Sequence, residues 1–328
     1  MKKWCVMLVV ALSFLTVTVG QTAAKVIKIN LGVVTKPGSA QNIVAEKFKE
    51  LIEQRTGGGV KVKIHHSASL GNETEILQQV QMGQIQMAVV TVGPFDTFDP
   101  IVRVIAYPFI FKSNEQADQV LDGPLGKEIL KSLERIGMKG LAFAENGFRN
   151  LTNNKRAVRS AEDVKGLKIR VMQSALHRGI WQALGANPTP MPWPIYTQLE
   201  QGVIDGQENP LWVIEVYKLY EVQKYMTMSR HVYSGHIDVA SLTWWNALDF
   251  KMQEEIQRAI YEASIYQRKD NREKDAGRLA ILKEKGMQIE ENPSVDTFRS
   301  KVTDLKNMDL FKDPRVRDML KRFMDATK

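Results

Sequence analysis

The stretch VIKINLGVVTKPGSAQNIVAEKFKELIEQRTGGGVKVKI, residues 26–64, contains the pattern that most of the chain repeats. Residues 26–34 alternate apolar and polar side chains as a strand does, and residues 39–55 place apolar side chains at helical spacing. Glycines 57–59 end that helix, and residues 60–64 resemble a second strand. A strand, a helix and a strand in this order predict an α/β fold with largely parallel sheets.

Outward from this unit, short strands and helices continue to alternate, and two lobes are expected. We predict a first lobe over residues 25–150, to which residues 230–245 contribute, and a second lobe over residues 151–328 with C-terminal helices. A charge-laced helix over residues 250–285 carries one apolar stripe and is expected to span both lobes. Because no flexible linker separates the lobes, we expect several chain crossings and a hinge around a cleft, which suits the binding and release of a small molecule.

The N-terminus carries the features of a secretory signal peptide. A short positive start precedes an apolar run over residues 4–19, which is shorter than the roughly 20 residues of a transmembrane helix. Small residues at 22–24 come directly before Lys25. We therefore interpret residues 1–24 as a signal peptide that is cleaved after Ala24, with Gly20 as the second candidate position and an uncleaved anchor as the alternative.

Composition narrows the class of protein. Of 328 residues, 44% are hydrophobic and 25% are charged, which excludes a disordered, collagenous or coiled-coil chain. The formal charge is +8, but basic and acidic residues are interspersed, so attraction of small anions fits better than nucleic-acid binding. The single cysteine, Cys5, lies in the predicted signal peptide, so disulfides, thiol catalysis and cysteine-ligated metals are excluded from the exported chain, which fits a bacterial periplasm.

Sequence motifs of catalysis are missing. The chain has no Gly-x-Ser-x-Gly elbow, no phosphate loop, no Gly-x-Gly-x-x-Gly after the first strand and no His-Glu-x-x-His. His65 and His66 are neighbours on a predicted strand and point to opposite faces, while His231 and His236 are five residues apart. We therefore expect no enzyme activity, no cofactor and no metal; an unrecognised enzyme acting on a small acid is the less favoured alternative.

Two arginines, Arg149 and Arg170, stand at the ends of predicted strands. In α/β sheets, ligands bind outside the carboxyl ends of the strands. The planar guanidinium gives a carboxylate two parallel, charge-assisted hydrogen bonds. From chemistry alone, ion pairing of surface arginines with nearby acids is still the favoured explanation.

Four motifs carry a family resemblance. Phe-Arg at 148–149, Gly-Leu-Lys-Ile-Arg-Val at 166–171, Leu-Gly-Ala-Asn-Pro-Thr-Pro-Met at 184–191 and Asp-Gly-Gln-Glu-Asn-Pro at 205–210 occur in this order. The chain closely resembles the solute-binding proteins of tripartite ATP-independent periplasmic (TRAP) transporters, the DctP family. The resemblance covers the whole mature chain and includes Leu-Gly-Asn-Glu-Thr-Glu at 70–75 and Tyr-Pro-Phe-Ile-Phe at 107–111.

The resemblance implies an α/β, two-lobed periplasmic binding protein, type II-like, with a cleft between the lobes and a long helix spanning both. It implies capture of an organic acid, either a C4-dicarboxylate or a sugar acid such as a uronate or aldonate, through an arginine–carboxylate salt bridge. The acid would pass to the small and large TRAP membrane subunits. We expect a monomer without a nucleic-acid partner; a keto or amino acid as cargo, and a sensor partner that presents ligand to a receptor, are alternatives.

The resemblance also assigns site residues. Arg170 corresponds to the family arginine that forms a two-pronged salt bridge with the ligand carboxylate. Arg149 corresponds to a second arginine that reaches the same carboxylate or a neighbouring oxygen. Asn209 corresponds to an asparagine that donates its amide to the ligand. Glu73 lies where first-lobe acids of the family meet ligand hydroxyl or amino groups, although it serves equally as a first-turn acid of a helix.

Further candidates follow from position. Trp193 is a candidate apolar wall of the cleft, with core packing as the equal alternative. Met172 stands where many sugar-acid and dicarboxylate binders have proline, so the identity of the ligand does not transfer from a particular relative. The remaining candidates for ligand contact are Gln173, His236, Asp238, Asn146 and Phe95.

Overall fold

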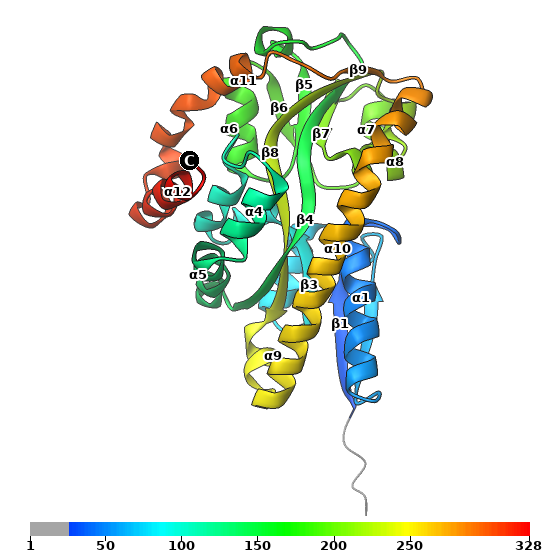
Figure 1. The fold of residues 1–328 in the computed structure, drawn as a ribbon, viewed down its shortest axis with the longest axis vertical. Coiled ribbons are helices and arrows are strands. Elements are labelled where there is room, and N and C mark those ends of the chain that lie inside the picture. The colour runs from blue at the N-terminus through cyan, green and yellow to red at the C-terminus, as the bar shows by residue number, and fades with distance from the viewer. Residues whose placement is uncertain (1–25) are drawn as a thin grey trace, which may run out of the picture.

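The computed structural model describes residues 26–328 (Figure 1). The predicted signal peptide, residues 1–24, lies outside the described residues. Within the described part, no helix is both long enough and apolar enough to cross a membrane.

One mixed β-sheet runs through the described part of the molecule (Figure 1). Its strands are β1 (Ile27–Gly32), β2 (Val60–His65), β3 (Met87–Thr91), β4 (Met138–Asn153), β5 (Lys168–Val171), β6 (Asn187–Pro190), β7 (Gly206–Asn209), β8 (Tyr225–Ser241) and β9 (Gln288–Glu290). Their order is β2-β1-β3-β8-β4-β7-β5-β6, and β9 pairs with β8. The strands β1 to β3 lie at the end of the sheet that belongs to the first lobe, and β5 to β7 lie at the end that belongs to the second.

Strand direction differs between the ends and the middle of the sheet. Strands β1, β2 and β3 are parallel, as are β5, β6 and β7. The long strands β4 and β8 between them are antiparallel to each other. The prediction of largely parallel sheets therefore holds only within each lobe, because β4 carries the chain into the second lobe and β8 brings it back in the opposite direction.

The helices of the described chain include the two that the periodicity predicts over residues 39–55 and 250–285. They are α1 (Ala40–Arg55), α2 (Glu73–Gln81), α3 (Val92–Phe95), α4 (Asn114–Leu121), α5 (Pro124–Ser132), α6 (Ala175–Ala183), α7 (Tyr196–Glu200), α8 (Leu211–Val216), α9 (Leu242–Asn246), α10 (Phe250–Glu284), α11 (Val295–Val302) and α12 (Pro314–Ala326). Asn72 begins α2 through a capping box with Glu75, which satisfies backbone donors at that terminus.

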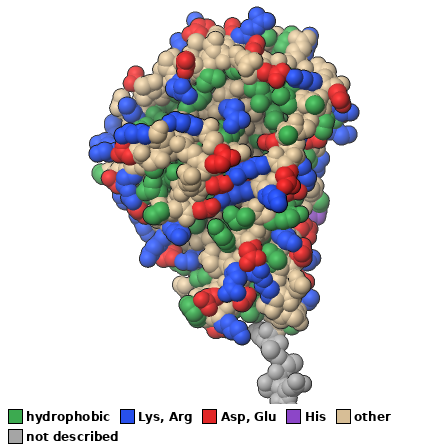
Figure 2. Space-filling view, viewed as in Figure 1, with side chains coloured by type: hydrophobic (Ala, Val, Ile, Leu, Met, Phe, Trp, Pro, Cys, Tyr) green, Lys and Arg blue, Asp and Glu red, His purple; other side chains and the backbone are tan. Residues whose placement is uncertain are grey.

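Helix α10 connects the two lobes. It packs against α1 and β4 and, further along, against α8 in the second lobe (Figure 1). Ile256, Ala259, Ile260 and Ala263 form its fully buried stripe, as the helical spacing predicts. Further along the helix, Arg268 pairs with Asp122, the residue directly after α4, at 2.7 Å. Figure 2 shows acidic and basic side chains interspersed over the face displayed, as they are in the sequence.

Strand β4 is longer than the sequence indicates. The predicted strand over residues 139–144 continues to Asn153, with irregularities in its pairing with β8 on either side of Gly147, whose φ is +116°. A left-handed φ at this value favours glycine, and bulges bend a strand. Arg149 therefore lies inside a bent strand and not at a strand end, so the sequence argument that placed it was wrong for this arginine.

Candidate functional site

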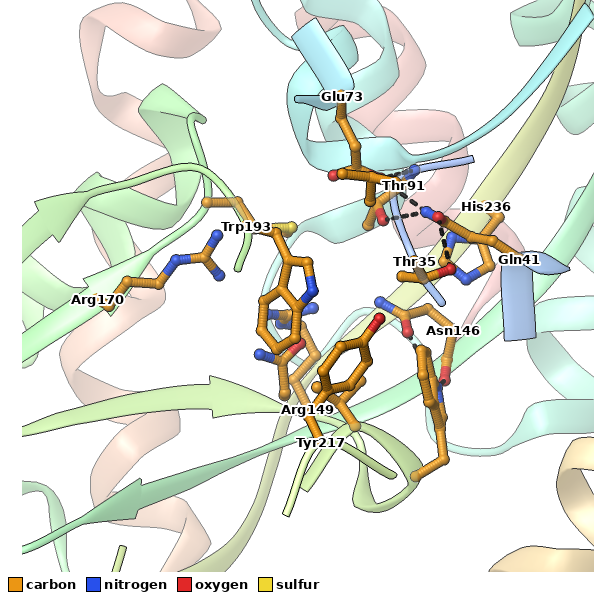
Figure 3. A pocket seen from close by; sticks show the side chains of 15 residues that line it. Thr35, Gln41, Glu73, Thr91, Asn146, Arg149, Arg170, Trp193, Tyr217 and His236 are labelled. Carbon is orange, nitrogen blue, oxygen red and sulfur yellow. Dashed lines mark hydrogen bonds between the residues drawn. The ribbon is translucent and has the colours of Figure 1, made fainter. Parts of the chain in front are cut away.

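A pocket lies between the lobes, where the carboxyl ends of β1 and β3 face those of β5 and β7 (Figure 3). The space not filled by protein atoms, open solvent at its mouth included, is about 380 Å³. Both lobes contribute to its wall, which consists of Val34, Thr35, Gln41, Glu73, Thr91, Asn146, Arg149, Arg170, Met172, Trp193, Asn209, Trp212, Val213, Tyr217 and His236.

Arg170 is a buried cation that has no acidic partner among residues 26–328. It lies on β5 and is 3% exposed, and its Nε donates a hydrogen bond to the backbone oxygen of Met191 at 2.8 Å. Its guanidinium carbon lies 5.9 Å from the centre of the Trp193 ring. Within residues 26–328 the side chain makes no other hydrogen bond and no ion pair. Burial, followed by the charge of Arg149, lowers the pKa of Arg170 to about 10.

Arg149 has the opposite environment. Its Nε and Nη2 pair with the carboxylate of Glu208 on β7, with Nη2 2.9 Å from Oε1. His177 and His231 also contact this carboxylate, at 3.3 and 3.2 Å. Burial opposes ionisation of Glu208, but these neighbours, above all Arg149, hold its pKa well below the usual range. Of the three guanidinium nitrogens of Arg149, Nη1 alone is buried without a hydrogen-bond partner among the described residues.

The first-lobe side of the pocket is lined by polar and acidic groups. Oε1 of Glu73 accepts hydrogen bonds from Nε2 of Gln41 at 2.7 Å and from the backbone N–H of Thr91 at 2.8 Å. Gln41 is fixed in turn by the hydroxyl of Thr35, which donates to its Oε1 at 3.1 Å. In the described chain, Oε2 of Glu73 has no partner, so it is free to accept from a ligand hydroxyl.

His236 lies near this polar group on β8 (Figure 3). It is 1% exposed, and both ring nitrogens are buried without a partner in residues 26–328. Burial, followed by the charge of Arg149, lowers the pKa of His236 to about 3. The ring is therefore neutral at pH 7 and offers one donor and one acceptor, which is the complement of a hydroxyl group.

Most of the residues that the sequence identified meet in this pocket. Those that line it are Arg170, Arg149, Asn209, Glu73, Trp193, Met172, His236 and Asn146. Asn209 donates its amide to Oε1 of Gln207 at 2.6 Å, and Asn146 donates to the hydroxyl of Ser234 at 3.2 Å.

Three predicted contacts lie outside the pocket wall. Asp238 is two residues beyond His236 on β8 and lies under α10, where it accepts a hydrogen bond from Ser264 at 2.5 Å. Burial raises the pKa of Asp238 to about 7. Phe95 packs in the hydrophobic core with no exposed surface, and Gln173 is half-buried beyond the end of β5.

Several residues of the pocket wall were not predicted from the sequence. Thr35 follows β1 and Thr91 ends β3, so both satisfy the rule that flagged Arg170, namely a polar side chain at the carboxyl end of a strand. Gln41 is in the first turn of α1. Trp212 is in α8, and Tyr217 directly follows α8. These last three have no pattern that separates them from ordinary helix or core residues.

Known proteins share this fold and about one-third of the aligned residues. Residues 31–308 match the family described as bacterial extracellular solute-binding protein, family 7. The C4-dicarboxylate-binding periplasmic protein DctP of Rhodobacter capsulatus is 33% identical over 267 residues, covering 80% of this chain and 79% of the relative.

Two solved structures extend the comparison. A TRAP periplasmic solute-binding protein from Polaromonas sp. JS666, bound to D-erythronate, is 33% identical with a TM-score of 0.85, covering 90% of this chain and 98% of that one. The sugar acid binding protein DctPAm from Advenella mimigardefordensis strain DPN7T, in complex with galactonate, is 33% identical with a TM-score of 0.87, covering 92% and 99%.

The family and the fold are those of transport proteins that bind solutes. DctP-family proteins are periplasmic, bind organic acids and work with TRAP membrane permeases. The two-lobed α/β architecture, the pocket between the lobes and the family match over residues 31–308 lead to one assignment. The chain belongs to bacterial extracellular solute-binding protein family 7, the DctP-type solute-binding proteins of TRAP transporters.

Proposed function

We propose that this protein captures a sugar acid, such as an aldonate or a uronate, and delivers it to the small and large membrane subunits of a TRAP permease. The observation that carries the proposal is Arg170, a buried cation facing the pocket without an acidic partner among residues 26–328. A buried charge without a counter-ion is costly. A ligand carboxylate supplies that counter-ion through two parallel hydrogen bonds to the guanidinium.

Two further donors stand near the same point. Nη1 of Arg149 lacks a partner in the described chain, and Asn209 presents its amide on the pocket wall. We assign both to the carboxylate or a neighbouring ligand oxygen. Because Glu208 fixes the other nitrogens of Arg149, this arginine offers a donor whose direction is set before the ligand arrives.

The first-lobe side of the pocket favours hydroxyl groups over a second carboxylate. Glu73 presents a free carboxylate oxygen there, and His236 presents a neutral ring. A C4-dicarboxylate would place its second negative charge toward Glu73, and no further Lys or Arg belongs to the pocket wall of the described chain. The relatives bound to D-erythronate and galactonate carry ligands with one carboxylate and several hydroxyls, which supports the same class.

Capture requires that the acid binds the closed arrangement of the lobes more tightly than the open one. The acid first docks on Arg170, and closure of the second lobe then removes the ion pair from water. The attraction strengthens because screening falls in the closed pocket. The bound acid favours the closed state because only that state completes its contacts with both lobes. The acid is released to the permease chemically unchanged.

A thermal-shift screen of residues 25–328, followed by calorimetry, tests this proposal, because a ligand that binds the native state raises the melting temperature. The matched set is galactonate, galacturonate, galactose, succinate and malate. We expect shifts with one or both sugar acids and none with galactose, which shares hydroxyls but lacks the carboxylate.

Each other result has a definite meaning. A shift with galactose alone contradicts the arginine anchor, and shifts with succinate or malate alone contradict the sugar-acid class. Conversion of the recovered acid would identify an enzyme instead. Binding without acid uptake, when the protein is reconstituted with its permease, would favour the sensor partner.

A further inference from the structure

Of the hydrogen-bonded contacts between the lobes, two lie beside the pocket, one on each side of it. On one side, residues 33–38 after β1 meet Tyr217, which follows α8. On the other side, Asp96, directly after α3, meets the start of α6. In both places a group of the first lobe contacts a group of the second.

Tyr217 makes the first contact. Its hydroxyl accepts a hydrogen bond from the backbone N–H of Lys36 at 2.9 Å, and Nζ of Lys36 lies 4.8 Å from the centre of the ring. The ring packs edge-on against Trp193 at a centroid distance of 4.6 Å, and Figure 3 shows the two side chains next to each other. Tyr217 is therefore held by its own lobe while its hydroxyl reaches the other lobe.

Asp96 makes the second contact. Its Oδ2 accepts hydrogen bonds from the hydroxyl of Ser174 at 3.0 Å and from the backbone N–H of Leu176 at 3.2 Å. These groups form the first turn of α6, where a carboxylate is favoured by the helix dipole. Oδ1 pairs with Nε of Arg103 at 2.5 Å, which fixes the orientation of the carboxylate. Asp96 is absent from the pocket wall.

The lobes also touch between Asp96 and the pocket. A Cβ atom built on Gly93 of the first lobe would lie 2.6 Å from Cε of Met172 in the second. A separation of the lobes would break this packing together with the two hydrogen-bonded contacts. Their free energies therefore contribute to the closed arrangement alone.

We propose that Tyr217 and Asp96 are positioning residues that latch the closed cleft from its two sides and so set how long a bound acid is retained. The latches act through the population of the closed state. A binding-competent state that is less populated weakens apparent affinity by the same factor. Mutations within one interface change dissociation rates more than association rates.

Tyr217→Phe and Asp96→Asn remove the latch groups with little change in shape. Stopped-flow measurements with galactonate should show roughly three- to tenfold faster dissociation for Tyr217→Phe, as expected for the loss of one net hydrogen bond. The increase should be larger for Asp96→Asn, because Oδ2 of Asp96 accepts two hydrogen bonds from the second lobe. The effects should multiply in the double variant, because the two sites are independent. The selectivity between galactonate and galacturonate should stay unchanged in Asp96→Asn, because Asp96 lies outside the pocket wall and does not contact the ligand.

Tyr196→Phe is the matched control. The Tyr196 hydroxyl donates to Glu221 at 2.9 Å within the second lobe, outside the pocket wall. We expect parental dissociation rates for this variant. Unchanged rates in the two latch variants, or equally large changes in the control, would overturn the proposal.

A second measurement requires no ligand, so it separates failure of the latches from failure of the sugar-acid proposal. Residues 25–328 contain no cysteine, and Lys63 and Gln182 are exposed side chains on β2 and α6, one in each lobe. Fluorophores on Lys63→Cys and Gln182→Cys report the distance between the lobes by single-molecule energy transfer. The latch variants should populate separated lobes more than the parent, and identical distributions in parent and variants would overturn the latches whether or not galactonate binds.

Discussion

Arg149 and Arg170 line one pocket from neighbouring regions of the sheet, and the protein neutralises only the first. Arg149 is paired with Glu208, which also contacts His177 and His231. The side chain of Arg170 has one hydrogen bond to a backbone oxygen, and no acid within residues 26–328 pairs with it. One positive charge is therefore part of the scaffold, and the other is available for a ligand.

The two arginines therefore have different effects: the ion pair of Arg149 bears on the stability of the fold, and Arg170 bears on the affinity for a ligand. A buried ion pair that loses one partner leaves an uncompensated charge, which destabilises the fold. A buried cation that already lacks a partner costs stability while it is present, and its removal relieves that cost. Substitutions at the two places should therefore move stability in opposite directions.

The largest effect is expected from Glu208→Gln. The amide preserves the volume but leaves Arg149 without its counter-ion, so the free energy of unfolding should fall by about 3 to 5 kcal/mol. Urea denaturation of the ligand-free protein measures this loss. Glu221→Gln, which removes an exposed carboxylate of the same lobe, should change stability by less than about 1 kcal/mol. Equal losses in both variants would show that Arg149 does not depend on Glu208.

Arg170→Ala should have the complementary signature. Affinity for galactonate should fall by about 3 kcal/mol or more, over a hundredfold, because the carboxylate loses its buried counter-ion. The free energy of unfolding should not fall, since an unpaired buried cation has been removed. Calorimetry and urea denaturation of the same sample give both numbers. Nearly unaltered binding would contradict the carboxylate anchor.

Arg170→Lys sharpens the same comparison. Lysine keeps the positive charge but presents it as a point, so it cannot form two parallel hydrogen bonds with a carboxylate. We expect at least a tenfold loss of galactonate affinity, about 1.4 kcal/mol, by calorimetry. Parental affinity would mean that charge alone, without the planar fork, binds the acid.

The elements that are regular over short distances could be predicted from the sequence. Helices α1 and α10 follow the predicted ranges closely, and β5 places Arg170 near a strand end, because apolar spacing and N-cap residues act within a few positions. The length of β4 could not be predicted in this way. Its second half is polar in sequence but buried by partners on both sides, β7 and β8.

The partner of Arg149 was beyond sequence reasoning for a related cause. Glu208 and Asn209 are adjacent on β7, so their side chains point to opposite faces, and the family resemblance drew attention only to Asn209. The pairing joins residues 59 positions apart across two strands. It depends on the register of Leu151 with Glu208, which no local pattern specifies. The polar set around Glu73 has the same origin, since Gln41 and Thr91 reach it from separate elements.

The smallest effect we expect is a pH dependence that originates in His236. Folded His236 has a pKa of about 3, whereas an unfolded histidine titrates near 6.5. Below about pH 6.5 the unfolded state therefore binds a proton that the folded state excludes, and stability falls as the pH is lowered toward 3. In urea titrations of parent and His236→Asn, the parent-minus-variant stability should decrease by about 0.7 kcal/mol from pH 7 to pH 6. The raised pKa of Asp238 acts in the opposite direction but is common to both proteins, so it cancels in the difference. A flat difference for His236→Asn would mean that the ring is not held neutral in the pocket, and the assignment of a hydroxyl to this position would lose its basis.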